Sequence, residues 1–260
     1  MHQAIRALGW ATKLLWIILI VIVITIAYSA TQISIAFGET QTTTTEQAIT
    51  LSFPININNQ GLYDLNQLNI TTKVTDQNSQ TLANGTTIAQ LVQKGARETI
   101  IHSITISFAQ ILAQNSSLLS NDTDLIVFQY VSLNYANAIP LSVHANHTMQ
   151  WGAPLANLVI SNPTFHAYNS THSIASVQLH FENHNQYMPV TGVARTEIYS
   201  TSHTLRGTAT TNIDSQPNTS CSTQVDVLVR NFRSVPPRGE IHLFFETSAF
   251  NYGPVVMLFG

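Results

Sequence analysis

One continuous apolar segment opens the chain, and a long series of short alternating segments follows it. The stretch from Leu14 to Ala30 reads LLWIILIVIVITIAYSA and carries no charge. A run of about 17–25 apolar residues is long enough to cross the hydrocarbon core of a bilayer as a helix. The pattern therefore predicts a membrane anchor, with the lipid bilayer as the first partner of the chain.

Charge around this segment predicts its orientation. Arg6 and Lys13 precede the apolar run, and no Lys or Arg follows it until Lys73. Because cytoplasmic flanks of membrane helices carry the excess of positive charge, we expect residues 1–38 to form a cytoplasmic tip plus a single-pass anchor, with the body outside the cytoplasm. A cleaved signal peptide is the alternative; the run exceeds a usual signal-peptide core, which favours an uncleaved signal-anchor. Both alternatives export the body.

The segment after the anchor has no hydrophobic period. Residues 38–47 read GETQTTTTEQ, in which Thr dominates. Polar segments without periodicity are typical of linkers. We therefore expect residues 39–47 to form a short, extended stalk between the membrane and the body.

From residue 48 onward, apolar and polar residues alternate with a period of two. SFPININ (52–58), LNITTKV (68–74) and TIIHSITISF (99–108) are three clear cases. This period is that of half-buried strands, and turn signals every 8–15 residues are typical of β-sandwiches. A short helix is expected within 109–119. Further strands are expected at 125–135, 139–143, 155–161, 174–182, 190–199, 223–229 and 240–246.

The two halves of the body share one layout. An apolar strand ends in Asn58-Asn59-Gln60 in the first half and in Asn183-His184-Asn185-Gln186 in the second. An aromatic residue follows in each half, Tyr63 or Tyr187, and then a second strand. This internal repetition predicts two β units, at 48–150 and 151–260.

Trp151-Gly152-Ala153-Pro154 lies at the expected boundary between these units. A Trp beside Gly and Pro indicates a fixed inter-domain elbow in which the indole ring fills the contact between the halves. A Trp that stacks on a sugar is the functional alternative. Trp151, Gly152 and Pro154 are therefore the candidate elbow residues.

The layout of the body resembles that of a known family. Behind the membrane helix, the same order occurs twice: a strand, an Asn-rich turn, an aromatic residue, a second strand and a polar turn. The layout is similar to the late-embryogenesis-abundant type 2 (LEA14-like, WHy) β-sandwich proteins, in the tandem, membrane-anchored form found in archaea. WGAPLANLVI (151–160) and FETSAFNYGPVV (245–256) are similar to the second-repeat opening and the terminal strand of that family. The resemblance covers residues 47–260. It implies two tandem antiparallel Ig-like sandwiches and no catalytic activity.

Composition narrows the choice of partner. Only 9% of residues are charged and the net charge is −3, against roughly 25% charged residues in an average soluble protein. Without a cluster of Lys and Arg to neutralise phosphates, nucleic acid is excluded as a partner. A surface with few carboxylates has little acid-sensitive stability to lose, so one expectation is that the body keeps its fold in acid. The alternative is an ordinary cell-surface composition, in which the many Ser, Thr and Asn residues mainly serve glycosylation. Cys221, the one cysteine, cannot form an intramolecular disulfide.

No motif for catalysis, cofactor or metal stands out. The chain has no G-x-S-x-G, S-x-x-K or H-E-x-x-H sequence. His180 and His184 are four apart, which on one strand separates them by about 13 Å, too far to share an ion unless the chain turns between them. We therefore expect no enzyme, no cofactor and no metal. The expected function is a membrane-anchored extracytoplasmic structural or interaction module. A cell-surface ligand- or glycan-binding module and an accessory subunit with protein partners in a larger membrane complex are the alternatives.

Acceptor sequences for N-glycosylation are frequent, which agrees with export and predicts a glycoprotein. Asn162 is excluded because Pro163 follows it. Four of the acceptors, at residues 84, 115, 121 and 218, are expected in turns, where a glycan has room. The candidate acceptors are Asn69, Asn84, Asn115, Asn121, Asn146, Asn169 and Asn218.

Overall fold

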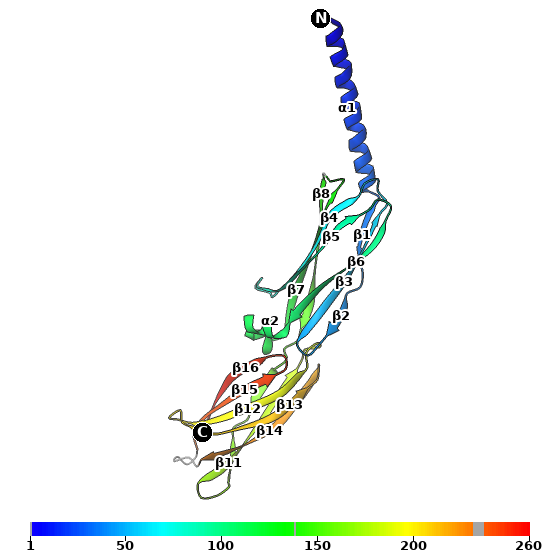
Figure 1. Cartoon of the computed structure of the whole chain (residues 1–260). Coiled ribbons are helices and arrows are strands. Elements are labelled where there is room, and N and C mark those ends of the chain that lie inside the picture. Colours follow the sequence, from blue (N-terminus) through cyan, green and yellow to red (C-terminus); the bar gives the residue numbers. More distant parts are fainter. Residues whose placement is uncertain (1, 138, 231–236) are drawn as a thin grey trace.

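A computed structural model describes residues 2–137, 139–230 and 237–260. One N-terminal helix, α1 (His2–Ala30), is followed by a long body of antiparallel strands (Figure 1). Within α1, the 22 residues Gly9–Ala30 form a span long and apolar enough to cross a membrane. At about 1.5 Å per residue this span is roughly 33 Å long. The apolar run from Leu14 to Ala30 is thus helical and could anchor the chain.

The first half of the body is a sandwich of two four-stranded sheets. In one sheet, β3 (Ala48–Asn59) pairs with β1 (Ile33–Phe37) and β2 (Gln41–Thr44) along one edge and with β6 (Arg97–Ser107) along the other. The facing sheet has the order β5 (Thr81–Val92), β4 (Leu65–Thr75), β7 (Thr123–Tyr135), β8 (Ile139–Trp151). A short helix, α2 (Phe108–Gln114), and a 3-10 turn, η1 (Ser116–Leu119), join β6 to β7.

The second half repeats this plan strand for strand. The strand β11 (His172–Asn183) pairs with β9 (Ala156–Ile160), β10 (Thr164–Ala167) and β14 (Thr219–Arg230). The facing sheet has the order β13 (Leu205–Ser215), β12 (Val190–Ser200), β15 (Gly239–Thr247), β16 (Asn251–Phe259). The predicted fold class, two tandem antiparallel β-sandwiches behind one apolar helix, is confirmed.

The expected stalk at 39–47 is wrong. Residues 41–44 form β2, which pairs with β3 from Gln41 opposite Ser52 to Thr44 opposite Ile49. All four side chains of β2 are exposed, so an edge strand held by its backbone leaves no hydrophobic period in the sequence. The first sandwich therefore begins at Ile33, only two residues after α1, and not at residue 48. The other expected boundary, 150/151, falls at the end of β8.

Three clusters of buried residues follow one another along the body. One, around Ile55, Leu65 and Tyr135, lies at the α1 end of the first sandwich. Another, around Val177 and Val227, lies within the second sandwich. The largest cluster crosses between the halves and includes Phe108, Trp151, Phe181 and Phe245. Because this cluster is continuous across the junction, the two sandwiches form one elongated body (Figure 1).

Candidate functional site

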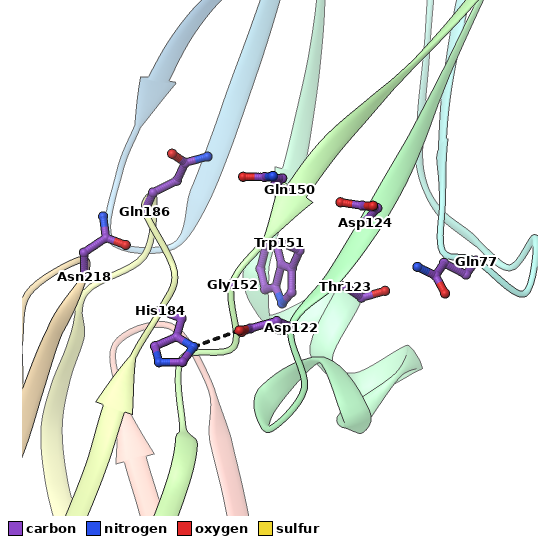
Figure 2. A pocket seen from close by; sticks show the side chains of 10 residues that line it. All are labelled: Gln77, Asp122, Thr123, Asp124, Gln150, Trp151, Gly152, His184, Gln186 and Asn218. Atoms are coloured by element: carbon purple, nitrogen blue, oxygen red, sulfur yellow. Dashed lines mark hydrogen bonds and ion pairs between the residues drawn. The ribbon is translucent and has the colours of Figure 1, made fainter.

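The junction between the sandwiches contains a hollow of about 560 Å³ (Figure 2). Three segments surround it: the turn that leads into β7, the end of β8, and the loop that follows β11. The turn between β4 and β5 adds Gln77, and the turn between β13 and β14 adds Asn218. Most side chains that line the hollow are amides or carboxylates. The lining residues are Gln77, Asp122, Thr123, Asp124, Gln150, Trp151, Gly152, His184, Gln186 and Asn218.

Trp151 belongs to the core beneath this hollow. Its side chain is 1% exposed, and its ring centroid lies 6.3 Å from that of Phe108. The indole N–H donates to the carbonyl of Leu118 at 2.9 Å, so the one polar atom of the ring is satisfied. A ring buried this deeply has no face free to stack on a sugar, and the structure places it in the cluster shared by both halves.

The next residues fix the angle of the elbow. A Cβ on Gly152 would lie 1.9 Å from the carbonyl oxygen of His184, so only glycine allows the two backbones this close. The Gly152 carbonyl accepts a hydrogen bond from the side chain of Asn185 at 2.9 Å. The Ala153 carbonyl accepts the His184 N–H, also at 2.9 Å. Pro154 is buried. The loop after β11 is thereby hydrogen-bonded to the segment between the sandwiches.

His184 bridges the two sandwiches (Figure 2 shows its bond to Asp122). Its Nδ1 lies 2.8 Å from Asp122 of the first sandwich, and its Nε2 lies 2.8 Å from Glu182 of the second. The other oxygen of Asp122 accepts the Ala153 N–H at 2.7 Å. A doubly protonated imidazole donates to both carboxylates at once. We call Asp122, Glu182 and His184 the junction triad.

Each member of the junction triad has a displaced pKa. Hydrogen bonds to Asp122 and then to Glu182 raise the pKa of His184. The hydrogen bond from His184, followed by that from Asn157, lowers the pKa of Glu182. Partial burial alone would raise the pKa of Asp122, but the Ala153 N–H and His184 outweigh it, and the net direction is down. All three shifts favour the charged forms.

The histidine pair named in the sequence does not come together. The chain leaves β11 after Asn183, so His184 lies in the junction loop, whereas His180 stays on the strand and bonds to Ser222 at 2.7 Å. Both nitrogens of His184 are taken by the junction triad. Among the described residues, no group of three or more His, Cys, Asp or Glu has the arrangement of a metal site.

A pair of equivalent asparagines organises the two halves. The amide nitrogen of Asn59 donates to three carbonyls, those of Tyr63, Val92 and Gln93. The amide nitrogen of Asn183 does the same with Met188, Ser215 and Gln216. Both side chains are buried. Asn59 joins the loop after β3 to the end of β5, and Asn183 joins the loop after β11 to the end of β13. The sequence pointed to these turns, but their role was missed; the shared spacing of Asn59 to Tyr63 and Asn183 to Tyr187 was the available signal.

The candidate glycosylation sites differ in accessibility. Five acceptors are exposed: Asn84, Asn121, Asn146, Asn169 and Asn218. Asn69 and Asn115 are half-buried, and the Asn115 amide nitrogen donates to Asp76 at 3.0 Å. Asn84 lies within β5 opposite Lys73, so its expected place in a turn is wrong. The polar sequence at Asn84-Gly85-Thr86 resembles a turn but lies within β5, in which both polar residues and the apolar Ile88 and Leu91 are exposed.

Comparisons with known proteins give no relative that names a function. No family model matches the chain, and no curated protein matches it. Its similarity to solved structures is distant. A red sea bream transglutaminase is 12% identical over 88% of this chain and 31% of that one, with a TM-score of 0.32. The BSP domain of a biofilm associated protein is 12% identical over 86% and 51%, with a TM-score of 0.32. The chain thus spans about a third and about half of the length of these proteins.

Proposed function

We propose that the chain is a rigid post on a membrane, a non-catalytic structural or interaction module. In this proposal α1 holds it in the bilayer, the body lies outside the cytoplasm, and the far end of the second sandwich is presented to partners at a fixed height. We assign it to the tandem late-embryogenesis-abundant type 2 class, which the twofold strand plan supports. The observation that carries the proposal is that both junctions, helix to sandwich and sandwich to sandwich, are packed and hydrogen-bonded.

The first junction supports the proposal through Ser29. This side chain, near the end of α1, is 0% exposed. Its hydroxyl oxygen accepts the N–H of Leu62 and the O–H of Tyr135, both from the sandwich. Ile26 and Ala30 of the same helix face pack against the adjoining core cluster. A helix seated in this way does not swivel freely on the body.

The second junction uses the same loop of the repeated unit. After β3, the N–H of Gln60 donates to the carbonyl of Gln32, which precedes β1, at 3.2 Å. After β11, the N–H of His184 donates to the carbonyl of Ala153, which precedes β9, at 2.9 Å. Each sandwich is thereby bonded to whatever lies before it, helix or sandwich. Repetition of one docking device is what a post built from units requires.

Spin-label distances across both junctions test the rigidity. In the full chain, reconstituted into nanodiscs with Cys221→Ser, one label pair at Val21→Cys and Ile101→Cys spans the first junction. A second pair at Ile101→Cys and Leu258→Cys spans the elbow. Labels fit at the last two positions because both native side chains are more than half exposed. We expect one narrow distance distribution from each pair; broad distributions from the unmodified chain would refute the post.

A matched insertion gives the control. Four Gly-Ser residues inserted after Gly152 should broaden the elbow distribution, because the insertion separates Trp151 from the hydrogen bonds of the junction loop. The same four residues inserted between Ser202 and His203, in the exposed hairpin at the far end of β12, should leave it narrow. Protease added to intact cells tests the orientation: digestion of the body supports export, and digestion only after lysis contradicts it.

A glycan-binding module is the second candidate, and the hollow favours it. Gln77, Gln150, Gln186 and Asn218 line the hollow with amides, which both donate and accept hydrogen bonds, as sugar hydroxyls require. A glycan array probed with the full chain, and with Gln150→Ala and Gln186→Ala together, tests this candidate. Binding that the double substitution abolishes would support it. Absence of binding across the array would contradict the glycan-binding module, and the rigid post would be the remaining proposal.

A further inference from the structure

The end of the first sandwich nearest α1, which we call the base, includes the loops at residues 60–64 and 93–96. The base lies beside the last turns of α1 and not beyond them. Ile26 is one helical turn, about 6 Å, before Ala30, yet it already packs against the cluster around Leu65 and Tyr135. Figure 1 shows the top of the sandwich reaching the foot of the helix. The loops at this end therefore overlap the last turns of α1 in height.

Membrane dimensions then place these loops within the bilayer interface. The apolar span of α1 is roughly 33 Å long, and the hydrocarbon core of a bilayer is about 30 Å thick. If the span fills the core, Ala30 lies at the edge of the hydrocarbon. The headgroup region adds only about 5–8 Å on each side. Loops that reach the level of Ile26 must enter that region.

The side chains at this end match such an environment. Leu62, 54% exposed, lies beside the helix, because its N–H donates to Ser29. Tyr28, 64% exposed, is of the type enriched where hydrocarbon meets water. Lys94, within the turn between β5 and β6, and Arg97, the first residue of β6, are also exposed. These are two of the three Lys and Arg residues between Ile33 and Trp151.

We propose that this base is a second membrane contact, in which Leu62 enters the boundary between headgroups and hydrocarbon while Lys94 and Arg97 bind lipid phosphates. The inference rests on the proposed anchor. Two acids lie at the same end: Asp64, whose carboxylate accepts the Lys94 backbone N–H, and Glu98. The base is therefore not strongly cationic, and its ligand is the phosphate that every phospholipid carries. The lipid headgroup layer holds the post upright.

An environment-sensitive fluorophore measures the depth of the base. In the full chain with Cys221→Ser, single labels at Val21→Cys, Leu62→Cys and Leu205→Cys report on the helix, the base and the far end of the body. Leu205 is the matched control, since its exposed fraction, 49%, is close to that of Leu62. The samples are nanodiscs of a zwitterionic phosphatidylcholine, with and without an anionic phosphatidylglycerol. Nitroxide-bearing lipids quench labels within the bilayer, and aqueous iodide quenches exposed ones.

We expect position 62 to emit at shorter wavelength than position 205 and to be quenched by nitroxide lipids, in both lipid compositions. The base contact is overturned if iodide quenches the label at position 62 as strongly as the label at position 205. If nitroxide lipids still quench the label at position 21 in that case, the anchor stands. No lipid quenching at position 21 overturns the anchor and the inference together. Quenching at position 62 only with the anionic lipid overturns the assignment to phosphate in general.

Charge removal tests the two cations. Lys94→Gln with Arg97→Gln should lower the number of phospholipids that remain bound when the chain is released from nanodiscs and weighed by native mass spectrometry. Lys73→Gln with Arg230→Gln removes the same charge from exposed positions away from the base. Equal losses from the two double variants would overturn phosphate binding at Lys94 and Arg97.

Discussion

Single residues with several backbone partners determine the shape of this molecule. Asn59 and Asn183 each bind three carbonyls, and Gly152 allows two backbones to pass at a distance that any Cβ would block. A buried carbonyl that loses its donor costs about 1–3 kcal/mol, so residues of this kind constrain the loops more strongly than any surface contact does. The function proposed for the whole chain depends on these few positions.

Trp151 is the most consequential of them. We expect Trp151→Ala to lower the free energy of unfolding by about 3–5 kcal/mol, because a large cavity opens in the cluster that joins the halves. Trp151→Phe should cost less, since it keeps an aromatic ring in the cluster and opens a smaller cavity, although it also loses the bond to the Leu118 carbonyl. Denaturant titration of the full chain measures both. An unchanged stability, together with loss of a bound partner, would instead make Trp151 a recognition residue.

The junction triad gives the elbow a pH dependence whose direction follows from its pKa shifts. The raised pKa of His184 means that its stabilisation is complete below its ordinary value of 6.5 and is lost as pH rises through the folded pKa. The pKa values of Asp122 and Glu182 are lowered, so the stabilisation from these carboxylates is complete above their ordinary values of 3.8 and 4.5. It is lost as pH falls through the folded pKa of each group. The triad is therefore strongest between about pH 4.5 and 6.5.

We expect His184→Gln to lower the melting temperature most within that window and least at alkaline pH above the raised pKa of His184, where the wild-type imidazole has lost its proton. Thermal unfolding of both chains between pH 4 and pH 9 provides the measurement. His180→Gln is the matched control, because His180 bonds only to a neighbouring serine within its sheet. A melting-temperature difference that does not vary with pH would contradict the assigned role of His184.

At the scale of elements, periodicity predicted the strands whose two faces differ. β3 alternates between buried and half-buried residues along its length, and its sequence shows this period. β2 has four exposed residues, and β13 carries mainly small polar side chains; neither gives a period-two signal. Edge strands of this kind are held by backbone hydrogen bonds, which the residue pattern does not record. The error about the stalk has this physical origin.

Turns rather than strands should carry the glycans. Asn121, Asn169 and Asn218 are exposed outside or at the ends of strands, whereas the Asn115 amide nitrogen is occupied by Asp76. Because the transferred sugar is attached to that nitrogen, we expect modification at two or more of the three exposed sites and none at Asn115. Peptide mass spectrometry after expression in a glycosylating host tests this. Occupancy at Asn115 with empty turns would show that accessibility does not decide the matter.

On the scale of the molecule, the sequence predicted two units and their boundary but not the junction between them. Asp122 and His184 are 62 residues apart, and nothing in their local sequences pairs them. The contact between the loop after β11 and Ala153 is a backbone hydrogen bond from His184, and the residue pattern does not record such bonds. Likewise, the docking of α1 depends on Ser29, which the pattern shows only as a polar residue near the end of an apolar run.

The charge content of the whole body leads to a final prediction, resistance to acid. The chain has 13 carboxylate side chains in 260 residues. Among the described groups, pKa values are lowered at Asp122, Glu182, Asp226 and Glu240. Lowered carboxyl pKa values mean stability that is present at neutral pH and lost as pH falls through the folded value. Because these four groups are partly or largely exposed, solvent screening keeps each loss small.

Full protonation of the carboxylates leaves 10 Lys and Arg and 10 His as positive charges, spread along a chain of 260 residues, so self-repulsion in acid is weak. The apolar clusters and the backbone hydrogen bonds of the asparagine turns do not titrate. We therefore expect the near-ultraviolet circular dichroism of the full chain in nanodiscs to persist from pH 7 to below pH 4, with at most a small change as Asp122 and Glu182 of the junction triad are protonated. A Lys-rich and Glu-rich β-sandwich on the same kind of anchor is the control. Loss of the tertiary signal above about pH 4, where ordinary carboxyl groups begin to protonate, would show that paired carboxylates hold this fold together.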